Sequence, residues 1–256
     1  MCSREQCRHD EVNIVVIGCG WWSQGWHLPH LSQNAVNGVH IIALVDSVPQ
    51  PTSVLDPNLK SMKELGIQYS CPTFSSVSSL LADKGILERM DGAIVCTPHA
   101  THFDIGCQLL KGKKNLHIFM EKPMTTDLED AQKMYELVTN NAKIQTPPPA
   151  FLINHSANFR PQARMAQSLL SPSQNAIGDL RHVTASFVSP LTWIFEDPSN
   201  VGWNKPSNNM LGNGFAWGQS SHILSWIYHV TKLDPKKVFC VMTHSEITGA
   251  DVCKFM

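Results

Sequence analysis

The segment Asn13-Ile14-Val15-Val16-Ile17-Gly18-Cys19-Gly20-Trp21-Trp22-Ser23 decides the fold of the first half of the chain. Its apolar run predicts a buried strand over Asn13–Gly18, because a short run of branched aliphatic residues that ends at glycine is typical of a core strand. Two glycines then let the backbone turn tightly, and a helical pattern follows over Gly25–Gln33. The segment therefore predicts a strand, a tight turn and a helix, the unit from which parallel sheets are built.

Outward from this segment, short apolar runs alternate with helical patterns. Further strands are predicted at His40–Asp46, Tyr69–Phe74, Gly92–Thr97 and His117–Glu121. Further helices are predicted at Ser61–Leu65, Ser76–Ala82, Thr101–Leu110 and Asp127–Asn140, the last with Asp127 as its N-terminal cap. The alternation predicts an α/β fold with a doubly wound parallel sheet, a Rossmann domain over residues 1–146.

A second domain is predicted over residues 147–256. Pro147, Pro148 and Pro149 mark the boundary, since proline neither continues a helix nor enters a central strand. After them, strands are predicted at Phe151–Asn154, Arg181–Val188 and Lys237–Thr243, and helices at Pro161–Leu170 and Ser220–Val230, with an irregular Trp- and Asn-rich stretch between.

Composition favours a globular protein that acts on small molecules. The chain has 256 residues, 43% of them hydrophobic and 16% charged, and a formal net charge of -1, so nothing indicates a nucleic-acid groove or a membrane surface as partner. No apolar run is long enough to span a bilayer and the first residues are polar, which predicts a cytoplasmic protein. The eight cysteines include no Cys-x-x-Cys pair, which favours reduced thiols over disulfides or zinc.

The glycine turn predicts a dinucleotide site. Gly18 and Gly20 would let the backbone approach a pyrophosphate, and the helix N-terminus with Trp21 and Trp22 would face that anion. Asp46 ends the second strand, where a carboxylate accepts hydrogen bonds from the adenosine ribose and repels a 2′-phosphate. NAD is therefore predicted in preference to NADP. The alternative is an ordinary strand-to-helix turn with no ligand.

Three further segments resemble one family. They are Cys96-Thr97-Pro98-His99-Ala100-Thr101-His102, Glu121-Lys122-Pro123, and Gly212-Asn213-Gly214 with His222 beyond it. Together with the glycine turn they resemble the glucose–fructose oxidoreductase and inositol dehydrogenase (Gfo/Idh/MocA) family. The resemblance implies an NAD(P)-dependent dehydrogenase that moves hydride between nicotinamide and a sugar, polyol or related hydroxy compound. It also implies that the second domain is an α+β open sheet, of which this sequence supplies only the beginning.

The resemblance suggests two catalytic residues. It places Lys122 beside the nicotinamide, where an ammonium can stabilise alkoxide character on the substrate oxygen. It makes His222 the candidate general base, since imidazole titrates near neutral pH. A surface lysine and a packed helix histidine are the structural alternatives. The chain departs from the family at Gly218 and Ser225, where members usually carry aspartate.

The resemblance also implies cofactor and substrate contacts. Residues expected to line the cofactor are Thr97, Pro98, His102 and Glu121, and residues expected to face the substrate are Asn158, Arg160, Trp203 and Gln219. His102 could instead cap its helix, and Arg160 could be a solvated helix start. The spacings of His27 with His30 and of His99 with His102 suggest metal pairs, but no third ligand is evident, so no metal is predicted.

Two other functions stay open on the sequence. Gly218 and the early end of the chain also fit a dinucleotide-binding protein without catalysis, or a fragment with no stable function. In the family, the free face of the C-terminal sheet often serves as an interface, so a homo-oligomer through that sheet is possible for a chain with exposed strand edges.

Overall fold

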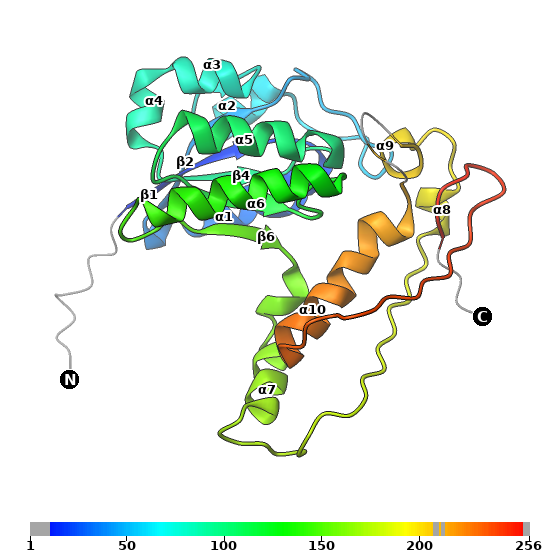
Figure 1. Cartoon of the computed structure of the whole chain (residues 1–256). Coiled ribbons are helices and arrows are strands. Elements are labelled where there is room, and N and C mark those ends of the chain that lie inside the picture. The colour runs from blue at the N-terminus through cyan, green and yellow to red at the C-terminus, as the bar shows by residue number, and fades with distance from the viewer. Residues whose placement is uncertain (1–10, 207–209, 211–212, 253–256) are drawn as a thin grey trace. The chain divides into compact units, whose positions relative to one another are not determined.

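The computed structural model describes residues 11–206, 210 and 213–252 (Figure 1). Gly212 of the glycine-containing segment before His222 lies outside this part, as do three of the eight cysteines, Cys2, Cys7 and Cys253. The chain divides into two compact units, one up to Ile153 and one from Asn154 onward, and each is described by itself.

The first unit contains one six-stranded sheet. Its strands are β1 (Val12–Ile17), β2 (Val39–Val45), β3 (Thr73–Phe74), β4 (Gly92–Val95), β5 (His117–Glu121) and β6 (Phe151–Asn154). Their order across the sheet is β3-β2-β1-β4-β5-β6, and the pairs β1 with β2, β1 with β4, β2 with β3, and β4 with β5 are parallel. This is the strand order of a Rossmann fold, in which ligands bind where the order reverses, here between β1 and β4. The predicted fold class is confirmed for this unit.

Helices cover both faces of the sheet. They are α1 (Leu28–Gln33), α2 (Met62–Tyr69), α3 (Val77–Ala82), α4 (Lys84–Arg89), α5 (His102–Gly112) and α6 (Leu128–Lys143), with short turns η1 (Ser23–His27), η2 (Ala35–Asn37) and η3 (His99–Thr101). Successive side chains of β1 alternate between two cores, as a strand buried on both faces requires. Val15 and Ile17 pack with α3 to α6, whereas Val16 packs with α1 and α2.

Caps that are readable in the sequence begin several of these helices. Ser61 and Glu64 form a reciprocal capping box at the start of α2, and the Asp127 side chain accepts from the Asp130 N–H at the start of α6. Both helices extend beyond their predicted ends. Tyr69 ends α2, so the strand predicted over Tyr69–Phe74 shrinks to β3, because the capped helix continues until Ser70 adopts a left-handed conformation.

In its described part, the second unit consists of helices joined by long irregular segments. Its elements are η4 (Ser156–Phe159), α7 (Pro161–Leu170), α8 (Thr192–Phe195), α9 (Val201–Asn204), η5 (Ala216–Ser220) and α10 (Ser221–Thr231). Helices α7 and α10 are joined by a hydrogen bond from the Gln167 side-chain amide to the His229 carbonyl, 2.7 Å. A small apolar cluster of Ile194, Phe195 and Ala250 supports the rest.

Two strand predictions for the second unit are wrong. Residues 181–188 and 237–243 carry no strand, although their sequences are apolar. Val188 is 90% exposed and Phe239 is 92% exposed, so neither segment has the partner strand or covering layer that a sheet requires. Within the described residues, the open sheet expected for this unit is therefore not formed. An oligomer through that sheet has no support from these residues.

The division between the units falls later than the predicted boundary at residues 146 and 147. Residues 151–154 pair at the edge of the first sheet as β6, and the Ile118 N–H donates to the Ala150 carbonyl beside it, 2.9 Å. The three prolines thus lead into the last strand of the first unit. Among the described residues, no helix combines the length and apolarity that crossing a bilayer requires.

Gly18 provides a test of this fold. Its φ is +88°, and an added Cβ would lie 2.6 Å from the Cys96 carbonyl carbon at the end of β4. We expect Gly18→Ala to lower the free energy of unfolding by about 1–3 kcal/mol, from backbone strain and overpacking. Urea unfolding followed by tryptophan fluorescence measures this.

Gly25→Ala is the matched control, because a Cβ there meets nothing within 4 Å. We expect this variant to be as stable as the wild type or more stable, since alanine favours helix. Equal losses in both variants would contradict the assigned close approach of β1 and β4.

Candidate cofactor and substrate site

The glycine turn leaves open space above β1. Gly18 lies against Cys96 and Thr97 of the neighbouring strand end, whereas a Cβ on Gly20 would meet no atom within 4 Å. Ser23, in the third position of the fingerprint, is fully buried. A small residue is therefore required at this position, and the space over Gly20 is where a pyrophosphate can approach the backbone.

Asp46 is held at the end of β2 by backbone donors. Its carboxylate accepts from the Cys19 N–H at 2.7 Å and from the Val48 N–H at 2.9 Å, one on each oxygen. Each oxygen keeps a further lone pair, so the side chain can still accept from ribose hydroxyls. The open glycine turn and this fixed carboxylate together fit NAD: Gly18 and Gly20 would face the pyrophosphate, and Asp46 the adenosine ribose.

Three tryptophans cluster on the helix that follows the turn. The ring centroids of Trp22 and Trp26 lie 5.1 Å apart, and Trp21 lies 5.6 Å from Trp22 and 5.9 Å from Trp26. The helix passes through one π-helical turn, η1, between Ser23 and His27. Such turns occur often at functional sites. The cluster gives the cofactor turn an indole wall and an intrinsic fluorescent reporter.

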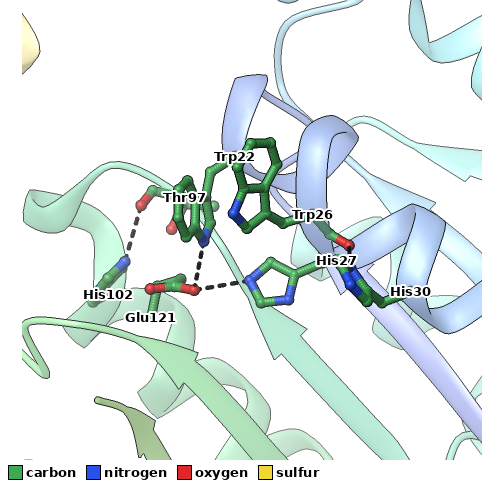
Figure 2. Close-up of polar contacts among 7 residues, drawn as sticks. All are labelled: Trp22, Trp26, His27, His30, Thr97, His102 and Glu121. Atoms are coloured by element: carbon green, nitrogen blue, oxygen red, sulfur yellow. Dashed lines mark hydrogen bonds and ion pairs between the residues drawn. The ribbon is translucent and has the colours of Figure 1, made fainter. Parts of the chain in front are cut away.

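Glu121 links the glycine-turn helix to the end of β5. Its Oε1 accepts from the Trp22 Nε1–H at 2.9 Å and lies 2.8 Å from His27 Nε2, as Figure 2 shows. The residue is only 8% exposed. A carboxylate with two partners at this depth fixes the relative position of the helix and the strand. Glu121, which the resemblance placed at the cofactor, holds the indole wall through this contact.

Lys122 is buried directly after Glu121. Burial lowers the pKa of Lys122 from 10.5 to about 8, and the Glu121 carboxylate partly opposes that shift. A lysine in such surroundings is typical of a functional group and disfavours the surface-lysine alternative. His99, which begins η3 after β4, belongs to the same environment: burial first, and then the Lys122 ammonium, lower its pKa from 6.5 to about 3.

His102 joins two loops at the carboxyl edge of the sheet. Its Nδ1 lies 2.7 Å from the Pro123 carbonyl. Its Nε2 lies 2.9 Å from the Thr97 carbonyl, the contact drawn in Figure 2. The side chain is fully buried, and burial lowers its pKa. The two hydrogen bonds to backbone carbonyls oppose this lowering of the pKa. Both nitrogens face backbone, which leaves none for a ligand and makes His102 a residue that positions Thr97 and Pro123.

The second unit gathers three predicted site residues around one cavity. Arg160, Gln219 and His222 line a cavity of about 500 Å³, a volume typical of small-molecule sites. The His222 ring stacks on Phe187, with centroids 6.5 Å apart, and meets His155 edge-on at 6.0 Å. These aromatic contacts orient His222 at the wall of the cavity.

Asn158 and Trp203 do not line this cavity. The Asn158 amide donates to the Ser225 hydroxyl, 2.9 Å, and so joins η4 to α10. Trp203 packs edge-on against Phe195, and a Cβ on Gly218 would lie 3.4 Å from its ring. The indole thus lies at van der Waals distance from the position where the resemblance implies an aspartate, and Ser225, the other departure, makes a structural contact.

Sequence reasoning missed His27 and His99 as members of the site. His27 follows Trp22 on the same helix and shares its partner Glu121. His99 follows β4, which pairs in parallel with β5, so its position beside the strand that ends at Glu121 could have been read from the strand order. Both histidines had been considered only as halves of metal pairs.

Comparison with known proteins identifies the family of this chain. The family model described as an oxidoreductase family with an NAD-binding Rossmann fold, GFO_IDH_MocA, matches residues 12–147, more than half of the 256 residues. The match confirms the resemblance and the NAD cofactor that it implies. None of the curated proteins matches the sequence.

Solved structures share the fold at low sequence identity. The WlbA dehydrogenase from Bordetella pertussis, in complex with NADH and UDP-GlcNAcA, is 16% identical, with a TM-score of 0.63 over 86% of this chain and 59% of that one. The myo-inositol 2-dehydrogenase from Lactobacillus plantarum is 16% identical, with a TM-score of 0.62 over 88% of this chain and 58% of that one. The chain therefore spans somewhat more than half the length of these structures.

The Glu121 link predicts a specific loss of stability. Glu121→Ala removes the acceptor of Trp22 and leaves the buried His27 ring without its partner, so we expect the free energy of unfolding to fall by about 1–3 kcal/mol. Glu121→Gln keeps an acceptor oxygen and should lose less. Urea unfolding measures both variants. Equal losses would show that the charge of Glu121, and not its role as acceptor, stabilises the contact.

The pKa of Lys122 predicts a pH-dependent stability. Between its folded value of about 8 and its ordinary value of 10.5, the unfolded chain binds a proton here that the folded chain has released. The free energy of unfolding of the wild type, relative to Lys122→Met, should therefore rise with pH in this window, by on the order of 3 kcal/mol in total. Below the window both states hold the proton and the burial cost is complete. Urea unfolding of both proteins across the window measures the difference, and a difference independent of pH would contradict the assigned burial.

Proposed function

Because this chain belongs to the Gfo/Idh/MocA oxidoreductase family, whose fold is an NAD-binding Rossmann fold, we propose that it is an NAD-dependent dehydrogenase acting on a carbinol carbon. The substrate would be a sugar, a polyol or a related small hydroxy compound. The observation that carries the proposal is the buried Lys122 at the carboxyl end of β5, with its pKa lowered to about 8. Carboxyl ends of strands near the reversal of strand order are where ligands bind in open α/β sheets.

Lys122 is suited to the oxygen of the substrate. A buried ammonium donates hydrogen bonds more strongly than one in water, because the local dielectric is low. It would donate to the hydroxyl oxygen and stabilise the alkoxide character that develops as the carbon loses hydride. Bound NAD would supply the hydride acceptor. Since the pKa of Lys122 is about 8, the ammonium form predominates near neutral pH, and deprotonation begins only slightly above it.

His222 is proposed as the group that takes the hydroxyl proton. It lies in the second unit at the wall of the cavity with Arg160 and Gln219. Its stacking on Phe187 fixes the plane of the ring, which a general base requires. A neutral ring nitrogen can accept a proton directly, so the mechanism needs no carboxylate at position 218.

A protein that binds NAD without catalysis is the second candidate. The observation that favours it is Gly218, because this position carries no carboxylate where the family resemblance implies one. The two candidates predict the same cofactor affinity and differ only in turnover.

Replacement of Lys122 separates the two candidates. We expect Lys122→Ala to lower kcat by about a hundredfold or more, the scale for loss of one oxyanion donor, with NADH affinity unchanged. Lys111→Ala, a matched change at an exposed residue of α5, should leave kcat unchanged. NADH binding is followed by quenching of the tryptophan fluorescence, and turnover on sugars, polyols and sugar acids by NADH absorbance.

Turnover that survives in Lys122→Ala would remove this lysine from the mechanism. NADH binding by the wild type with no turnover on any of these compounds would establish the binding protein instead.

A further inference from the structure

The cavity of the second unit has one sign of charge. Eleven residues line it, and Arg160 is the charged one among them, with no aspartate or glutamate. Besides His222, the other polar groups at the wall are hydroxyls and an amide, from Ser156, Thr184, Ser186 and Gln219. A cavity with this lining attracts anions and offers no negative charge to a cationic ligand.

Arg160 keeps its charge available. Within the described residues it forms no ion pair, and its side chain is exposed. It also occupies the N-cap of α7, a ten-residue helix that begins with Pro161 and has no side-chain cap. The partial positive charge of this helix end adds to that of the guanidinium.

Gly218 removes the negative charge that the family places nearby. An aspartate in this position would add a carboxylate one residue before Gln219, which lines the cavity. Gly218 contributes no side chain there, and a Cβ on it would lie in ordinary van der Waals contact with the Trp203 ring, 3.4 Å away. The same departure that counts against a carboxylate in catalysis therefore leaves the field of Arg160 unopposed.

We propose that the substrate of this chain carries an anionic group, a carboxylate or a phosphate, which Arg160 binds in the cavity beside His222. The proposal rests on the proposed function and adds the class of its substrate. A guanidinium binds either group through two parallel N–H···O bonds. The hydroxyls of Thr184 and Ser186 and the Gln219 amide can satisfy the remaining oxygens, and Phe187 and Trp226 offer apolar faces to the carbon skeleton.

Matched sugars test this proposal on the full chain saturated with NADH. The probes are glucose, glucuronate and glucose 6-phosphate, with binding measured by isothermal titration calorimetry. We expect at least one anionic probe to bind tenfold or more tightly than glucose, and the stronger of the two identifies carboxylate or phosphate as the group recognised.

Arg160→Gln should lower the affinity for that probe at least tenfold and leave glucose binding unchanged. Arg164→Gln is the control, since it makes the same change of charge at an exposed residue of α7 that does not line the cavity. Equal effects of the two substitutions, glucose binding as tight as that of the anions, or no binding of either anion would each overturn the proposal.

Because these measurements report binding without turnover, failure of the proposed function has a different signature. Arg160-dependent binding of an anion with no oxidation of any anionic or neutral compound by NAD would refute the dehydrogenase and keep the anion site. Oxidation of neutral polyols alone, with no anion bound, would keep the dehydrogenase and refute the site.

Discussion

The candidate site of the first unit depends on a single carboxylate oxygen. Oε1 of Glu121 accepts from Trp22 and lies within hydrogen-bond distance of His27, so the end of β5 is tied to the helix that leaves the glycine turn. The sheet alone brings the carboxyl ends of β1, β4 and β5 to one edge, but it does not fix what stands above that edge. The contact at Glu121 fixes the helix above that edge, because two partly buried partners on one acceptor tolerate little displacement. The indole wall and the following Lys122 take their positions from it.

The burial that makes this link rigid also sets the chemistry of its neighbours. Lys122 and His99 share an environment poor in water, and the pKa of each is lowered mainly for that reason. The two shifts have different consequences. His99, with a pKa of about 3, is neutral throughout the physiological pH range. Lys122, with a pKa of about 8, is a cation near neutral pH and loses its proton as the pH rises above 8. The same desolvation thus leaves His99 without charge and gives Lys122 a charge that depends on pH.

The sequence predicted the first unit well because its signals are local and repeated. The bounds of β5 and β6 agree with the prediction, and Asp127 caps α6 as the sequence predicts. The segments 181–188 and 237–243 have the same apolar character but no partner, and strand formation depends on hydrogen bonds to another strand that no local pattern reveals. The contacts of Glu121 were equally out of reach, since its partners are more than ninety residues away in the sequence.

The two units differ in what constrains them. Under the proposed function, the glycine turn, Asp46 and Lys122 meet an invariant cofactor, and each of these residues follows the family resemblance. Gly218 and Ser225 depart from it, and both are taken up by packing or structural contacts, with Trp203 over the first and Asn158 bonded to the second. The charge of the cavity in the second unit comes from Arg160, since no aspartate or glutamate lines it. Variation of the cavity changes which hydroxy compound can be held, while the cofactor side keeps one chemistry. Under the proposal of an anionic substrate, the departures at 218 and 225 accompany a change of substrate class.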